Sequence, residues 1–294
     1  MPWLSLIAAV FALLWGSLWG SFLNVVVYRV PAGLSVVHPR SRCSSCGTPI
    51  AAWHNIPVVS WIWLRGHCST CKAPISPRYP AVEASVAVLS LALAMPWLPA
   101  LLDPAALLDP AGLPWRPLLA LLGEQAVVFT WVAIALIDAD TFLIPDVLSL
   151  PLPLVAIGIA AVVGEQRGVD LQMAVLGAVV AGLGLWLLMW LYARMTGREG
   201  LGFGDVKLLA SIGALLGLGA VPVVLLAAAL QGLAFALLYA LLSRGKATEE
   251  RGLQSLRHLA IPFGPFLVLG GIEWLLLHRL GAQAMAAQGL WLLD

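Results

Sequence analysis

Long apolar segments separated by short polar ones make up most of this chain. A helix of about 20 apolar residues is long enough to cross the ~30 Å hydrocarbon core of a bilayer. The alternating pattern of barrel strands is absent, so helices are the predicted elements. We predict eight transmembrane helices, at 3–27, 82–101, 118–138, 146–164, 172–193, 206–220, 223–242 and 259–280. The sixth of these segments is short, and Pro222 leaves its boundary with the seventh open.

Composition supports this interpretation. Hydrophobic residues make up 61% of the 294 residues, charged residues only 11%, and the mean hydropathy is +0.95. A soluble domain needs more polar surface than this to cover its core. We therefore predict an all-α polytopic membrane protein in contact with lipid. The net charge of +1 gives no sign of nucleic-acid binding, and we expect none.

The basic residues are distributed unevenly over the polar segments. Of the sixteen Lys and Arg residues, the stretches 28–81, 194–207 and 243–258 hold six, three and four. With eight spans these stretches fall on one side, and basic loops are typically cytosolic. Both termini then face away from the cytosol. The segment 3–27 lacks a basic n-region and is too long for a signal peptide, so we interpret it as a retained first span.

All four cysteines lie in the polar insertion 28–81. They form two pairs, Cys43-Ser-Ser-Cys46 and Cys68-Ser-Thr-Cys71, with twenty-one residues between the pairs. This spacing is typical of a zinc ribbon, in which four thiolates hold one Zn²⁺ tetrahedrally. Disulfides are the alternative, but a cytosolic loop lies in a reducing compartment, which favours zinc. Four cysteines complete the coordination sphere, so the metal is expected to be structural.

Acidic residues gather in two segments that end or begin a predicted span. The first, 137–146, reads IDADTFLIPD, and the second, 199–207, reads EGLGFGDVK. Both lie at the predicted cytosolic boundary, where ionisable residues commonly have a function. A solvated helix end or a charge near a helix dipole is the alternative for any single acid. The three glycines of the second segment favour a site, because a simple helix cap does not need repeated close backbone approach.

Two acids brought together from these segments would form a catalytic pair. Neighbouring carboxylates do not both ionise easily, so they share a proton. The ionised group can take a proton from water while the water attacks a peptide carbonyl. The protonated group can stabilise the oxyanion and then protonate the leaving amine.

Several motifs give the sequence a specific resemblance over nearly its whole length. The chain resembles the bacterial type 4 prepilin peptidases, which are bifunctional leader peptidases and N-methyltransferases with a GxGD-type aspartyl protease site. The motifs are GSFLNVV at 20–26, the two CxxC pairs with NIP at 55–57 between them, PRYP at 77–80, IDADTFLIPD at 137–146, LGFGDVK at 201–207 and PFGP at 262–265.

This resemblance implies that Asp138 and Asp205 are the catalytic aspartates, with Asp140 as the alternative for the first. The implied supporting residues are Asp140, Asp146, Gly202, Gly204 and Lys207. The implied substrates are prepilin or pseudopilin precursors, cut after a glycine between a basic cytosolic leader and an apolar helix. S-adenosylmethionine is the implied methyl donor, although nothing in the residues locates its site. The implied partners are the pilus or type II secretion assembly machinery.

We therefore divide the chain into a first transmembrane helix (1–27), a cytosolic zinc-binding and methyltransferase-associated loop (28–81) and a multi-span peptidase domain (82–294). Two alternatives come from other functional classes. A proton-coupled transporter would place its acids near the middle of the bilayer and would show two similar halves. A non-enzymatic assembly subunit would use the zinc loop for docking, but would leave the two acidic motifs unexplained.

Overall fold

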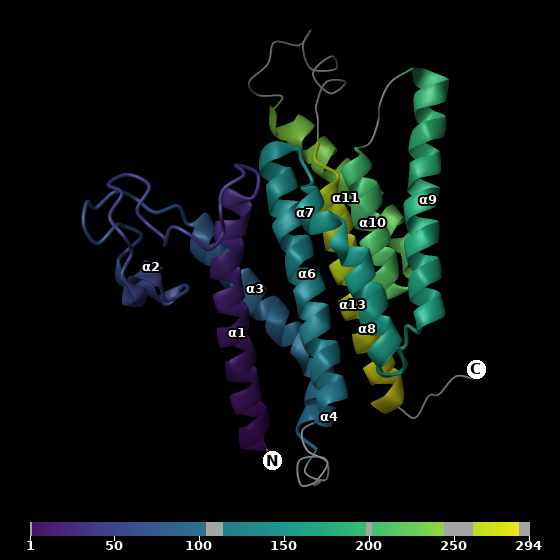
Figure 1. Cartoon of the computed structure of the whole chain (residues 1–294), viewed down its shortest axis with the longest axis horizontal. Coiled ribbons are helices and arrows are strands. Elements are labelled where there is room, and N and C mark those ends of the chain that lie inside the picture. Colours follow the sequence, from purple (N-terminus) through teal and green to yellow (C-terminus); the bar gives the residue numbers. More distant parts are fainter. Residues whose placement is uncertain (1, 104–113, 198–201, 244–260, 288–294) are drawn as a thin grey trace. The chain divides into compact units, whose positions relative to one another are not determined.

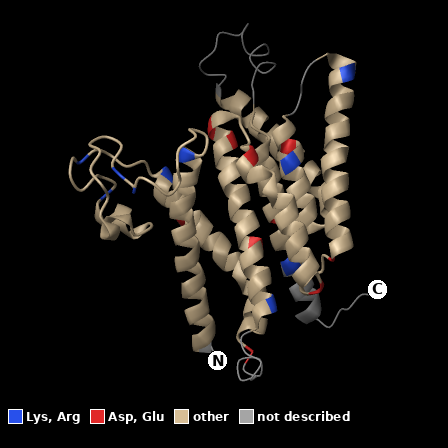
Figure 2. Ribbon diagram, in the orientation of Figure 1, with Lys and Arg blue, Asp and Glu red and all other residues tan. Residues whose placement is uncertain are grey.

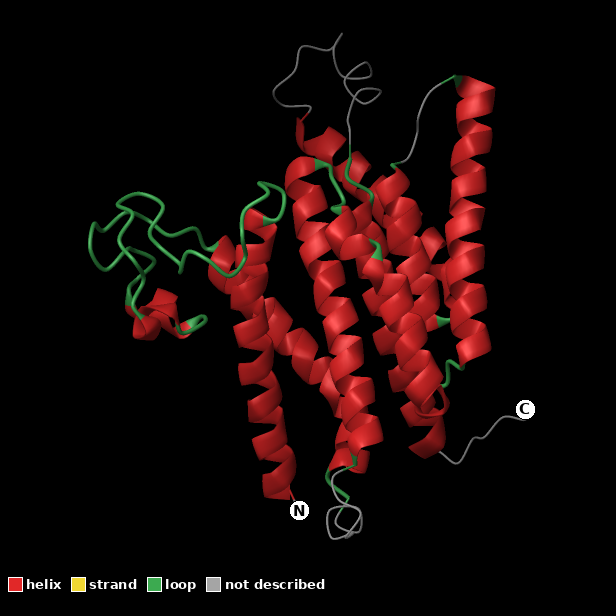
Figure 3. Ribbon diagram, in the orientation of Figure 1, coloured by secondary structure: helices red, strands yellow, loops and turns green. Residues whose placement is uncertain are grey.

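The computed structural model describes residues 2–103, 114–197, 202–243 and 261–287 (Figure 1). Its contacts divide the chain into two compact units, Met1–Ala133 and Ile134–Asp294. Helix α6 continues from the first unit into the second. Helices dominate both units, and the described residues contain no strand, only two isolated bridges in the cysteine loop (Figure 3). Most charged residues lie near helix ends or in loops rather than along the helices (Figure 2).

The first unit is organised around two closely packed helices, α1 and α3. A Cβ built on Gly16 would lie 2.4 Å from the Cβ of Ser90, and one on Gly20 would lie 2.6 Å from the Cα of Glu83. Small residues four apart allow such close approach between membrane helices. The elements of this unit are α1 (Pro2–Arg29), η1 (Ala52–Asn55), α2 (Val59–Trp63), α3 (Arg78–Ala94), η2 (Met95–Trp97), α4 (Leu98–Leu101) and the start of α6 (Trp115–Thr141).

A buried layer of hydrogen bonds joins these helices to α6. The indole of Trp15 donates to Oε1 of Gln125 at 3.0 Å, and the amide of Gln125 donates to Oγ of Ser90 at 3.1 Å. One position earlier, the fully buried Glu124 accepts from the indole of Trp97 at 3.2 Å. Interhelical bonds of this kind contribute about 1 kcal/mol each in membrane proteins. The layer therefore helps to fix α1, α3 and η2 against α6.

The second unit surrounds the short helix α10. Ten of its fourteen residues are buried, and it packs against α8, α9, α11 and α13. Its contact with α9 is close, because a Cβ on Gly177 would lie 2.1 Å from the carbonyl oxygen of Gly213. The elements here are the end of α6, α7 (Asp146–Ser149), α8 (Pro151–Arg167), α9 (Leu171–Thr196), α10 (Phe203–Leu216), α11 (Ala220–Ser243) and α13 (Gly264–Ala287).

The predicted all-α membrane fold is confirmed, and each of the eight predicted segments overlaps a helix. Six of the described helical segments are long and apolar enough to cross a membrane. Helix α10 has 14 residues and is about 21 Å long, too short to cross by itself. The boundary after α10 lies at residues 217–219 rather than at Pro222, which sits in the first turn of α11. Proline is tolerated there because the first turn lacks intrahelical partners for its N–H groups.

Two of the sequence predictions stay predictions: the orientation of the chain in the membrane and its division into three parts. Most of the basic stretch 243–258, which supports the orientation, lies outside the described residues. The division of the chain at residues 27 and 81 likewise stays a prediction.

Candidate active site and metal centre

Asp138 lies in the last turn of α6 and is only 5% exposed. Its Oδ2 accepts a hydrogen bond of 3.0 Å from the backbone N–H of Gly264, the first residue of α13. Free N–H groups at a helix N-terminus favour a negatively charged partner. The end of one helix and the start of another thus hold this carboxylate in place.

The chain leaves α6 three residues after Asp138. Phe142 has a positive φ of 57° and donates its N–H to the carbonyl of Asp138 at 2.9 Å, which ends α6. Pro145 then caps the start of α7 in an extended conformation. The residue between them, Ile144, projects into the second unit and contacts two glycines from distant parts of the chain.

Those glycines are Gly204 and Gly264, and neither position has room for a side chain. A Cβ on Gly204 would lie 2.7 Å from the Cβ of Ile144. A Cβ on Gly264 would lie 2.7 Å from Oδ2 of Asp138 and 3.4 Å from Cδ1 of Ile144. Contacts under 3 Å require something to move. Glycine at 204 and 264 is therefore required by the close packing around Ile144 and Asp138.

Asp205 lies in the first turn of α10 and is 7% exposed. Its Oδ2 accepts a 3.3 Å hydrogen bond from the N–H of Gly202, as in one half of a capping box. The carboxylates of Asp205 and Asp138 interact electrostatically. The structure thus brings together two buried acids that are 67 positions apart in the sequence. Such a pair can supply both a general base and a general acid.

The remaining predicted site residues lie around this pair. Lys207 forms an ion pair with Asp146, which joins α10 to α7, and its Nζ lies 5.4 Å from the ring centroid of Phe203. The side chain of Asp146 is 66% exposed, whereas that of Lys207 is 13% exposed. Asp140 is exposed, since two positions along a helix turn a side chain by about 200°. This arrangement favours Asp138 over Asp140 as the partner of Asp205.

Sequence reasoning missed the roles of Gly264 and Ile144. The signal for Gly264 was present, because PFGP at 262–265 is one of the motifs on which the resemblance rests. Ile144 lies inside the motif IDADTFLIPD, where it reads as one more apolar residue. Neither residue carries a reactive group, so only the three-dimensional packing reveals what they do.

The four cysteines gather into one cluster in the first unit. Their Sγ atoms all lie within 4.8 Å of one another, and those of Cys43 and Cys71 are 3.8 Å apart. A tetrahedral zinc with 2.3 Å bonds to sulfur requires sulfur–sulfur distances of about 3.8 Å. All four thiols are free. The cluster is therefore able to bind a metal, as the spacing predicts.

Two hairpins with the same hydrogen-bond pattern supply these thiols. In the first, the N–H of Gly47 donates to the carbonyl of Cys43 and that of Cys43 to Thr48, at 2.9 and 3.0 Å. In the second, the N–H of Lys72 donates to Cys68 and that of Cys68 to Ala73, at 3.1 and 2.8 Å. Gly47 and Lys72 both have positive φ, of 70° and 60°. Each CxxC pair thus adopts one compact turn.

A nearby hydroxyl prepares one of the thiols for metal binding. Cys46 Sγ and Thr48 Oγ1 are hydrogen-bonded at 3.3 Å. This bond, assisted by the backbone of Thr48, lowers the pKa of Cys46 to about 6. A metal ligand must be a thiolate, so the lowered pKa favours the binding form at neutral pH.

The cysteine loop is attached to α3 through a strained turn. Val58 has φ 61° and ψ −52°, and the N–H of Val59 donates to the carbonyl of Pro57 at 2.6 Å. This is the rare form of γ-turn, which is unfavourable for a β-branched residue. The N–H of Val58 donates to the buried Glu83 at 2.6 Å, which stabilises the turn.

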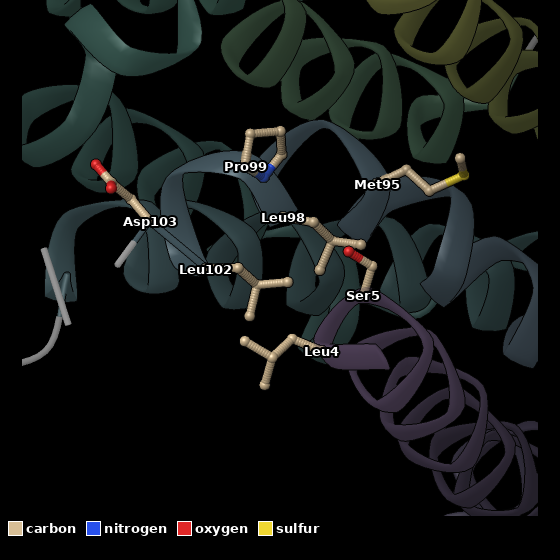
Figure 4. A pocket seen from close by; sticks show the side chains of 7 residues that line it. All are labelled: Leu4, Ser5, Met95, Leu98, Pro99, Leu102 and Asp103. Carbon is tan, nitrogen blue, oxygen red and sulfur yellow. The ribbon is translucent and has the colours of Figure 1, made fainter. Parts of the chain in front are cut away.

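A separate cavity of about 440 Å³ lies between the start of α1 and the η2–α4 segment (Figure 4). Ser5 and Asp103 are the polar residues of its lining, and the others are apolar. None of the predicted site residues lines it.

Comparison with known proteins places both sites within one family. The model of the bacterial peptidase A24 N-terminal domain matches residues 14–97, and that of the type IV leader peptidase family matches residues 126–237. The first range contains the four cysteines and the second contains Asp138 and Asp205. No solved structure matches the chain significantly.

Curated relatives are similar over nearly the whole chain. A prepilin leader peptidase/N-methyltransferase of Aeromonas hydrophila is 39% identical, over 92% of this chain and 90% of its own. Proteins of the same name from Dickeya chrysanthemi and Dichelobacter nodosus are 39% and 38% identical, the first over 92% of both chains and the second over 87% of this chain and 86% of its own. The resemblance drawn from the motifs is thereby confirmed, and the chain belongs to the type IV leader peptidase family.

Proposed function

We propose that this protein cleaves the leader from prepilin or pseudopilin precursors and then N-methylates the new N-terminus. The observation that carries the proposal is the buried pair of Asp138 and Asp205, held together in one unit of a chain from this family. The transporter and assembly-subunit alternatives are not favoured, because the acids lie at helix ends and the relatives are named as enzymes.

In the proposed reaction the two aspartates share one proton. The ionised carboxylate removes a proton from water, and the water oxygen attacks the scissile carbonyl. The protonated carboxyl donates a hydrogen bond to the developing oxyanion. It then transfers its proton to the leaving amine, which completes hydrolysis. Gly264 and Gly202 contribute by orienting the carboxylates through their backbone N–H groups.

The cofactors follow from the same proposal. Zn²⁺ is the metal that fits the four thiols, which would hold it in a closed, structural site. S-adenosylmethionine would supply the methyl group for the amine that cleavage exposes.

We further propose a location in the inner membrane, with the aspartate site at the cytosolic face and both termini periplasmic. The basic stretches 28–81 and 194–207 support this orientation. An acidic site on that side would also attract the basic leader of a precursor. The partners would then be the precursors, membrane lipid and the pilus or type II secretion machinery.

The test uses membrane vesicles that contain the full chain and a purified precursor with an intact leader and apolar segment. Inverted vesicles should release the leader and, with S-adenosylmethionine, add one methyl group to the new N-terminus, as measured by mass spectrometry. Right-side-out vesicles should do neither. Cleavage only in right-side-out vesicles would reverse the orientation, and no cleavage in either kind or in detergent would refute the proposed function.

Metal content gives a separate prediction for the cysteine loop. The purified protein should contain one zinc per chain by elemental analysis. Cys43→Ser should lose most of this zinc and make residues 28–81 sensitive to protease, because three thiolates no longer close the site. Ser44→Ala, in the same turn, is the matched control and should retain the metal. Protein without metal but with intact disulfides would contradict the zinc interpretation.

A further inference from the structure

Helices α9 and α10 lie side by side in the second unit (Figure 1). An apolar groove runs along their contact. Its volume is about 420 Å³, and every residue that lines it is apolar. We call it the α9/α10 groove. It is lined by Ala178, Val179, Gly182, Leu183 and Trp186 of α9 and by Phe203 and Val206 of α10.

One end of the groove reaches the candidate catalytic turn. Phe203 and Val206 lie in the first turn of α10, on either side of Asp205 in the sequence. Val206 is buried, whereas Phe203 is 57% exposed. The groove therefore begins at the same turn of α10 that carries the second aspartate.

The other end lies deeper along the helices. Helices α9 and α10 are antiparallel, since Gly177 contacts Gly213 while Gly182 lies opposite Ala210. The lining positions of α9 follow one helix face from Trp186 to Ala178, a length of about 12 Å. Because α9 is long and apolar enough to span the membrane, this direction leads from the aspartate end into the bilayer.

The shape of the groove suits a helix rather than a flexible polar chain. Ala178 and Gly182 contribute almost no side-chain volume to the lining of the groove. Small residues of this kind allow two membrane helices to approach closely. The indole N–H of Trp186 is the one side-chain hydrogen-bond donor of the lining, so an occupant must satisfy nearly all of its backbone groups itself, as a helix does. In the proposed substrate, the chain that follows the cleaved peptide bond is an apolar helix that continues into the membrane.

From this geometry we propose that the α9/α10 groove binds the apolar helix that follows the scissile bond of the substrate. This inference rests on the proposed function and adds to it a subsite for the membrane part of the precursor. Phe203 and Val206 face a different side of α10 from Asp205, so the chain that precedes the bound helix crosses the first turn of α10 to bring the peptide bond to the aspartates. Recognition is then divided, with the leader at the cytosolic surface and the helix in the groove.

Val179 and Val180 offer a matched pair of positions for the test. Their side chains are 47% and 46% exposed, but only Val179 lines the groove. Val179→Trp should fill the groove, and Val180→Trp adds the same side chain to a different face of α9. Both changes are made on exposed positions, so the packing of α9 on α10 is preserved.

Each variant is assayed with a full precursor and with a short peptide that contains the cleavage site but lacks the apolar segment. Val179→Trp should lower kcat/KM for the precursor at least about tenfold and leave that for the peptide within about twofold. Val180→Trp should stay within about twofold for both substrates. Equal values for the two variants on the precursor would overturn the proposed subsite.

Photo-cross-linking provides a measurement that does not depend on turnover. A benzoylphenylalanine at position 179 should cross-link to the apolar segment of the precursor, and one at position 180 should not. Cross-linking of position 179 to lipid alone would show that the groove holds an acyl chain and would refute the subsite. If the unaltered protein cleaves neither substrate, the proposed function fails, and the cross-link still decides whether the groove binds the helix.

Discussion

Changing either Asp138 or Asp205 to asparagine should abolish leader cleavage while the protein still folds and inserts into the membrane. Each change removes either the base or the acid of the pair, and such groups contribute about 10²- to 10⁴-fold to a rate. Asparagine preserves the size of the side chain, so the buried packing around both positions should persist. We therefore expect a loss of at least about 10³-fold in kcat, measured by release of the leader.

The double variant should be about as inactive as either single one, because the two groups act as a unit. Asp140→Asn is the matched control on the same helix turn, and its effect should be much milder because Asp140 is exposed. The pH profile of the unaltered enzyme should be bell-shaped, since one carboxyl must be ionised and the other protonated. Full cleavage by Asp205→Asn would exclude the paired mechanism.

Gly264→Ala should cause the second largest loss of cleavage, although residue 264 carries no reactive group. The new Cβ would lie 2.7 Å from Oδ2 of Asp138, so the carboxylate or the start of α13 must move. Displacement of a catalytic group by about 1 Å can cost about 100-fold in rate. We expect a loss of this size in kcat with a nearly unchanged KM, because the substrate is still bound.

Gly232→Ala is the control for this prediction. It places the same methyl group 3.6 Å from the ring of Phe266 in α13, which is an ordinary contact. That variant should retain activity within about twofold. Thermal unfolding of both variants separates misplacement from loss of fold. A Gly264→Ala protein that cleaves at the normal rate would show that the close contact with Asp138 does not position the carboxylate.

Local patterns in the sequence were sufficient for several features of this structure. Apolar segments long enough to span a membrane predict the helices, and two CxxC pairs predict the cysteine cluster, because both signals depend on spacing along the chain. Pro222 misled the placement of a boundary, since proline marks the first turn of a helix as readily as the gap before it. The true boundary follows Leu216.

Contacts between distant residues could not be predicted in the same way. The hydrogen bond between Gly264 and Asp138 joins positions 126 apart. No periodicity or composition marks such a pair, and Ile144 reads in the sequence as one more apolar residue before a proline. The preference for Asp138 over Asp140 came from the resemblance. The structure adds a physical reason for it, because only the first of these side chains is buried.

The two matching hairpins of the cysteine loop also affect the free-energy difference between the folded and the unfolded chain. An ion held between them links Cys46 to Cys68 across twenty-one intervening residues. A covalent cross-link over a loop of that size reduces the conformational entropy of the unfolded state by the equivalent of about 3 kcal/mol. A metal held by both hairpins acts differently, because it is released when the loop unfolds; it stabilises the folded loop through its binding free energy and needs no oxidant. The proposed zinc would therefore be a reversible cross-link between the two hairpins. It would form when metal is available and be lost when metal is scarce, in a compartment where a disulfide would not persist.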